Sequence, residues 1–206
     1  MKAAAALFPI LLFASAASFA APMNYTLDPA HTQVLFSWDH LGYSHPGGQF
    51  DRVDGTLVYD SDHPAKSSVR VSIPVDSLHT HVAALDKQLL GPTFLDAEKY
   101  PLITFVSGKV TPEGRKRFKV EGQLTVHGVT RPVTLDVTLN KAGKYPMIEA
   151  PALGFGARAR FGRSAFGVGY GVPMVGDALR VTITAEAIES HAFETKVLPL
   201  ERGGGK

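Results

Sequence analysis

The sequence predicts an all-β protein, a single antiparallel eight-stranded barrel with one short helix and room inside for a ligand. The first observation is that eight or so short segments alternate apolar and polar residues, which is typical of strands that bury one face. The second is that short turns join successive segments, as in an up-and-down meander. The third is that Gly55, Gly122, Ala157, Ala159 and Ala185 fall at inward positions and leave space in the interior. A two-sheet sandwich has the same periodicity, but the last two observations favour a closed barrel.

The predicted strands follow one another along the chain, and turn-forming residues such as Pro64 and Pro112 separate several of them. The one helical stretch covers residues 82–90, where Leu85 and Leu89 share a side, and we expect it to pack as a lid or plug. The domain spans residues 21–190, and residues 191–206 are assigned to a C-terminal tail. The strands are expected at 34–38, 53–59, 69–75, 103–105, 118–126, 133–139, 155–161 and 181–185.

The amino-acid composition excludes several classes of protein and of functional site. The chain of 206 residues is 45% hydrophobic and carries a net charge of +2, as expected of a globular domain and not of a disordered chain. The 21 basic and 19 acidic residues are nearly balanced, so we expect no nucleic-acid partner. The absence of cysteine excludes disulfides, thiolate metal sites and a cysteine nucleophile.

Residues 1–20 have the pattern of a secretory signal peptide. Lys2 precedes an uncharged apolar run, and Ser18 and Ala20 supply the small side chains that signal peptidase requires for cleavage after Ala20. An uncleaved membrane anchor is the alternative, but the strongly apolar part is only about eleven residues long and Pro9 interrupts it. We therefore expect a mature periplasmic protein that starts at Ala21.

No motif in the sequence supports catalysis or a bound cofactor. The stretch 162–167 contains Ser164 but lacks the spacing of a nucleophile elbow, and the glycines at 167–171 lack the spacing of a phosphate loop. His79 and His81 would share one face of an extended strand, as metal ligands do, but no third ligand lies at a recognisable spacing. We assign no catalytic residue, no metal and no cofactor.

Several segments, taken in order, resemble the YceI-like family of bacterial periplasmic polyisoprenoid-binding proteins. The most distinctive is FLDAEKYPLITF at 94–105, and GQLTVHGVTRPV at 122–133 is nearly as specific. The resemblance implies a lipocalin-like barrel with an elongated cavity for an isoprenoid or another long-chain amphiphile, and no known catalytic centre. The other matching segments lie at 25–36, 40–44 and 48–56.

One segment departs from the family pattern. The family usually has Arg-Asp-x-His-Leu after the third strand, whereas this chain has Leu85, Asp86, Lys87, Gln88 and Leu89. If the missing Arg and His hold a polar head group, this protein prefers a different head group or a fully apolar chain.

The candidate ligand-binding residues follow from the inward positions of the predicted strands. Trp38 is the sole tryptophan, and we expect it in the barrel lining rather than in a cofactor site. Arg158, Arg160 and Arg163 are candidates for a phosphorylated head group, with ordinary solvated positions around Phe161 as the alternative. The lining candidates are Val34, Phe36, Trp38, Phe50, Val53, Leu57, Phe105, Leu124, Leu135 and Phe155.

Three functions compete at this stage. The first is a periplasmic carrier or sequestering protein for an isoprenoid lipid, which is not an enzyme and makes at most transient contact with a membrane. The second is a metal or haem binder that uses histidines near the barrel mouth, and the third is an enzyme that acts on a bound lipid. The lipid itself and the oligomeric state, a dimer included, stay open.

Overall fold

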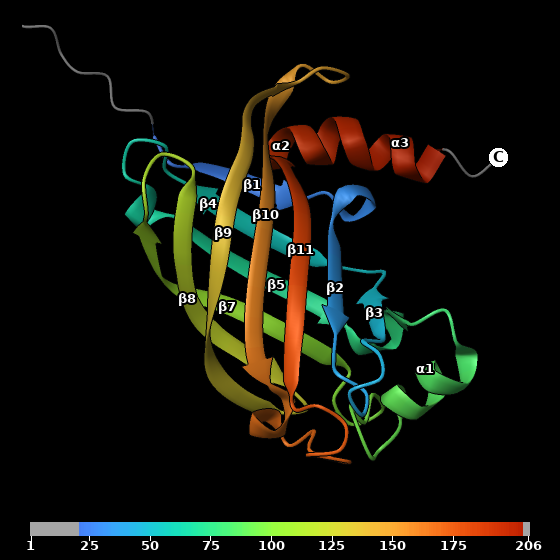
Figure 1. The fold of residues 1–206 in the computed structure, drawn as a ribbon. Coiled ribbons are helices and arrows are strands. Elements are labelled where there is room, and N and C mark those ends of the chain that lie inside the picture. Colours follow the sequence, from blue (N-terminus) through green and yellow to red (C-terminus); the bar gives the residue numbers. More distant parts are fainter. Residues whose placement is uncertain (1–20, 204–206) are drawn as a thin grey trace, which may run out of the picture.

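Strands β1 (Met23–Leu27) and β11 (Ala178–Glu189) pair side by side although they lie at opposite ends of the chain, and their pairing closes an antiparallel barrel (Figure 1). The computed structural model describes residues 21–203, so the leader expected at 1–20 lies outside the described residues. The predicted eight-stranded barrel is confirmed. Between the closing strands the barrel contains, in order, β4 (Asp54–Tyr59), β5 (Ser68–Pro74), β7 (Leu102–Pro112), β8 (Arg117–Val126), β9 (Val129–Tyr145) and β10 (Ala150–Gly162).

The first barrel strand is bent into two halves. β1 pairs with the end of β11, and β2 (Gln33–Ser37) pairs with the earlier part of β11 at residues 180–184. A 3-10 turn, η1 (Pro29–His31), joins the halves, and Asp28 caps it by accepting a hydrogen bond from Ala30 N at 3.0 Å. Two further short strands, β3 (Gly47–Phe50) and β6 (Leu78–His79), continue the sheet from β2. The remaining short turns are η2 (Pro64–Lys66), η3 (Val75–Ser77) and η4 (Arg163–Phe166).

The apolar residues of the alternating strands form one core that runs through the barrel. Two glycines expected to leave interior space do not. A Cβ at Gly122 would lie 2.4 Å from Phe105 Cζ, and a Cβ at Gly55 would lie 2.6 Å from Leu27 Cδ1, so larger neighbours already occupy those places. The three inward alanines, Ala157, Ala159 and Ala185, do line the cavity described below.

Helix α1 (Ala83–Leu90) confirms the predicted helix at 82–90. It ends at Gly91, and Pro92 follows, which is a common way to stop a helix. Leu89 and Leu90 pack against the barrel core, so the helix covers one end of the barrel (Figure 1).

The expected C-terminal tail is instead helical as far as Gly203. Ser190–Ala192 (α2), a π-helical turn at Phe193–Val197 and Leu198–Gly203 (α3) form one continuous run at the end of the barrel opposite α1 (Figure 1). The side chain of Glu189 caps this run by accepting hydrogen bonds from two backbone N–H groups, both at 2.9 Å. Phe193 is buried against Ile188 and Ala150, and this second small core holds the run on the barrel. No helix in the described part of the chain has the length and apolar character that crossing a membrane requires.

Candidate functional site: an apolar cavity inside the barrel

The barrel encloses a cavity of about 390 Å³, within the size range of small-molecule binding pockets. Every strand that forms the barrel contributes inward side chains to its wall. All of the apolar candidates from the sequence line it, which are Val34, Phe36, Trp38, Phe50, Val53, Leu57, Phe105, Leu124, Leu135 and Phe155.

Three aromatic side chains form one stretch of this wall. They are Phe36 on β2, Trp38 directly after β2, and Phe50 on β3. The ring of Phe36 stacks on Trp38 with centroids 6.0 Å apart, and Phe36 also contacts Phe50 at 5.5 Å. Trp38 is buried, with 7% of its surface exposed, so its indole reports on the cavity and not on bulk solvent.

Most polar residues of the lining lie at the two ends of the barrel, and Thr32 lies at the bend between β1 and β2. His40 and Gln88 lie at the end covered by α1, and Tyr59, Ser67 and Ser68 lie at the opposite end, where β4 turns into β5. The rest of the wall is mostly aliphatic and aromatic. The cavity is therefore largely apolar.

Two of the candidate arginines do not reach the cavity. Arg158 and Arg160 are exposed on the outer face of β10, because they alternate with Ala157 and Ala159, which face inward. Neither belongs to the lining in which they were expected, and the alternative of solvated outward positions describes both.

Arg163 does border the cavity, but its guanidinium is already bonded. It is only 6% exposed and donates to the carbonyl oxygens of Val168 at 2.7 Å, Tyr170 at 2.9 Å, Val175 at 2.9 Å and Gly176 at 3.0 Å. Burial lowers the pKa of Arg163, and the nearby carboxylate of Asp177 opposes that effect. Arg163 thus holds together the loop that follows η4, and this loop closes one end of the barrel.

Two loops meet over that end. The backbone of His40 pairs with Val175, and Gly176 N donates to Asp39 O at 2.8 Å, so the loop after β2 lies against the loop after η4. The ring of Phe94 contacts Tyr170 at 5.6 Å and connects the segment after α1 to the same place. The lining residues Phe94, Val168 and Val175 come from these loops.

Residues Leu85, Gln88 and Leu89 of α1 border the cavity, and so do several loop residues. The periodicity of the strands could not identify them, because loops have no period and a short helix can pack in several ways. One signal did point to α1. The two positions at which this chain departs from the family pattern, Leu85 and Gln88, are both on the cavity.

His79 and His81 lie close together, and they belong to a group of hydrogen-bonded side chains that holds α1 in place. His79 Nε2 lies 3.0 Å from His81 Nδ1, and His79 Nδ1 lies 3.4 Å from Asp86 Oδ2. Asp86 accepts hydrogen bonds from the Thr80 hydroxyl and, at 2.7 Å, from Thr80 N, which fastens α1 to β6. These bonds, the hydroxyl first, lower the pKa of Asp86, and His79 adds to the effect. Among residues 21–203, no third histidine or carboxylate joins the pair with all ligand atoms within 4.8 Å.

Comparison with known proteins agrees with this geometry. A UPF0312 protein of Pseudomonas putida (strain GB-1) is 36% identical over 189 residues, which cover 91% of this chain and 96% of the relative. The crystal structure of BcnA from Burkholderia cenocepacia is 26% identical and superposes with a TM-score of 0.71, covering 78% of this chain and 98% of that one. A polyisoprenoid binding domain from Saccharophagus degradans is only 12% identical but has the same fold, with a TM-score of 0.59 over 81% of this chain and 99% of that one.

The family resemblance seen in the ordered motifs is confirmed over nearly the whole described barrel. The model of the YceI-like domain matches residues 25–187, from β1 to the end of β11. Since that span includes every strand of the closed barrel and the α1 lid, this chain belongs to the YceI-like family.

Proposed function

We propose that this protein binds a polyisoprenoid or a similar long-chain amphiphile in its barrel cavity, and that it carries or sequesters the lipid in the bacterial periplasm. The observation that carries the proposal is the cavity inside the barrel with its largely apolar wall. Each CH₂ group moved from water into such a cavity contributes about 0.8 kcal/mol, so one five-carbon unit contributes about 4 kcal/mol before ordering costs. The Saccharophagus degradans domain, described as binding polyisoprenoids, supports the same ligand class.

The ends of the cavity favour a neutral head group. Arg163 is the one arginine or lysine among the described lining residues, and carbonyl oxygens already accept its hydrogen bonds. Gln88 offers an amide that can both donate to and accept from a hydroxyl or a quinone carbonyl. The ligand we propose is therefore a polyprenyl alcohol or quinone rather than a polyprenyl phosphate.

The residues that line the cavity support binding without catalysis. The lining residues that the structure describes include no carboxylate, and most of them are aliphatic or aromatic. The matched family and fold are those of binding proteins. We therefore assign no reaction to the bound lipid.

Transient contact with a membrane belongs to the same proposal. The two loops that meet over the α1 end carry exposed apolar side chains, with Tyr43 92% exposed, Met174 69% and Tyr170 61%. A lipid entering there would pass from a bilayer to the cavity with little exposure to water. Tyr43→Ser combined with Met174→Ser should weaken sedimentation with phospholipid vesicles several-fold and leave the thermal unfolding temperature unchanged. Equal sedimentation of the two proteins would refute contact through these loops.

The direct test is identification of the lipid that copurifies. The full chain should be expressed in a Gram-negative host with its leader, purified from the periplasmic fraction, and extracted with organic solvent for mass spectrometry. We expect an isoprenoid alcohol or quinone in a near-stoichiometric amount and an N-terminus at Ala21. A protein that yields no long-chain lipid, and that binds none when polyprenyl alcohols are added, would refute the proposal.

A further inference from the structure

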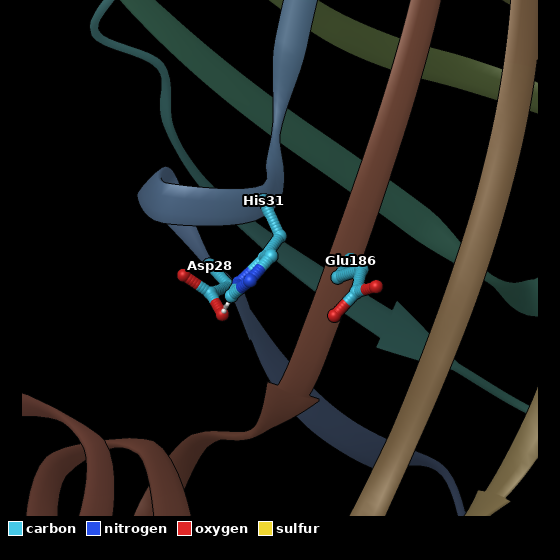
Figure 2. A group of neighbouring side chains, drawn as sticks. All are labelled: Asp28, His31 and Glu186. Atoms are coloured by element: carbon cyan, nitrogen blue, oxygen red, sulfur yellow. Dashed lines mark hydrogen bonds and ion pairs between the residues drawn. The ribbon is translucent and has the colours of Figure 1, made fainter. Parts of the chain in front are cut away.

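Three potential metal ligands meet on the outer wall of the barrel, away from the lipid cavity (Figure 2). Asp28 and His31 lie on the turn η1 that bends the first strand, and Glu186 faces them from β11. One ligand atom from each of the three lies within 4.8 Å of the others. None of the three belongs to the lining of the cavity described above.

The backbone holds this arrangement in place. Asp28 N donates to the carbonyl oxygen of Glu186 at 2.9 Å, and the hydroxyl of Thr32 donates to the same oxygen at 3.4 Å. Glu186 faces outward because it lies between Ala185 and Ala187 on the strand, and those two alanines face the core. The turn and the strand are therefore fastened together at the residue that contributes the third ligand.

The electrostatics of the group call for a cation. The side chain of Asp28 is only 4% exposed, and Glu186 Oε2 is buried with no hydrogen-bond partner among the residues that the structure describes. A buried carboxylate oxygen without a partner is costly and rare in folded proteins. The group contains two carboxylates. His31 contacts that of Asp28, and Oε2 of Glu186 has no hydrogen-bond partner among the described residues.

We propose that Asp28, His31 and Glu186 bind a divalent first-row transition metal ion such as Zn²⁺. One imidazole nitrogen and two carboxylate oxygens are a donor set that suits these ions, whereas Ca²⁺ and Mg²⁺ favour shells of six or more oxygens. A four-coordinate ion with ligands at about 2.1 Å places them about 3.4 Å apart. His31 Nδ1 is already 2.8 Å from Asp28 Oδ2, and the His31 side chain is 53% exposed, so it can adjust and admit the ion from solvent.

The position of the site assigns it a structural role. β1 and β11 form the pairing that closes the barrel, and the ion would link the turn after β1 to β11 beside that pairing. Metal bound to the folded state and not to the unfolded chain stabilises the fold. We infer that the ion holds the closing strands together and takes no part in contact with the lipid.

The test is a titration of the full-length protein after treatment with a chelator. Isothermal titration with ZnCl₂ should show one site per chain, and the thermal unfolding temperature should rise with the Zn²⁺ concentration. His31→Ala and Glu186→Gln should each lower the Zn²⁺ affinity at least tenfold and remove the thermal shift. His31 is exposed and Glu186→Gln preserves shape, so both variants should fold, which circular dichroism will verify.

The matched control is His81→Ala, which disrupts the close pair of His79 and His81. It should bind Zn²⁺ as the unchanged protein does, because His81 contacts His79 beside α1 and does not belong to the group of Asp28, His31 and Glu186. Absence of binding in the unchanged protein would overturn the proposal. Binding that survives His31→Ala and Glu186→Gln but fails in His81→Ala would overturn it equally, because it would place the ion at the His79 and His81 pair.

Discussion

The ring of Phe105 lies across the backbone of Gly122 on the neighbouring strand, where a Cβ would be 2.4 Å from Phe105 Cζ and 2.6 Å from Val106 O. Phe105 also lines the cavity, so this glycine determines how far the aromatic ring can lie from the cavity axis. The contact between a glycine on β8 and a phenylalanine on β7 thus shapes the cavity wall at Phe105.

Gly122→Ala should destabilise the protein by about 1–3 kcal/mol, because the new methyl group must displace Phe105 and the backbone of β7. Urea unfolding followed by circular dichroism measures the loss. Gly143→Ala is the matched control, since a Cβ at Gly143 meets nothing within 4 Å, and it should change stability by less than about 0.5 kcal/mol. Equal effects of the two substitutions would show that the Phe105 contact is unimportant.

The single tryptophan should report ligand entry. Adding a polyprenyl alcohol to the delipidated protein should shift or quench Trp38 emission saturably, because the indole is buried on the cavity wall. Trp38→Ala should weaken binding by about 2–4 kcal/mol, since a large aromatic contact is lost, and Trp38→Phe should weaken it less. Binding of both variants is measured with a radiolabelled alcohol. An unchanged spectrum at saturating alcohol would mean that the ligand does not reach this part of the barrel.

The head-group preference should respond to charge at the mouth. Gln88→Arg should raise the affinity for a polyprenyl phosphate about tenfold relative to the matching alcohol, because a charge-assisted hydrogen bond becomes available beside the cavity. Ala83→Arg adds the same charge on the same helix, at an exposed position outside the lining and on a different face from Gln88, and the ratio of affinities should stay unchanged. A competition assay with the two lipids gives this ratio directly. If both variants shift it equally, long-range attraction and not the cavity end governs the choice.

Arg163 should be required for stability and not for the recognition of phosphate. Arg163→Gln leaves several carbonyl oxygens of the loop after η4 without their buried donor, and we expect a loss of about 2–4 kcal/mol in the free energy of unfolding. Arg160→Gln, on the exposed outer face of β10, should change that free energy by less than about 0.5 kcal/mol. A stable Arg163→Gln protein with weaker phosphate binding would reverse this assignment.

The sequence by itself determined most of the strands and their inward faces. The strand β1, which closes the barrel against β11, was not among the predicted ones. Alternation along a strand is a local property, so Val34, Phe36 and Trp38 could be placed on the cavity wall from their spacing alone. The same rule places Arg158 and Arg160 outside, although their chemistry had suggested a role at the head group. The helix at 82–90 was also predictable, since its apolar residues lie on one side and a Gly-Pro pair ends it.

Only the tertiary structure decided which distant segments meet. No periodicity relates Asp28 to Glu186, and their proximity arises because β1 closes the barrel against β11. The same applies to the helical run after Glu189, which is stable because Phe193 finds a pocket against Ile188 and Ala150. The periodicity of a segment indicates which of its side chains face the core and which face the solvent. Contacts between remote residues depend on how the barrel closes, which involves all of its strands at once.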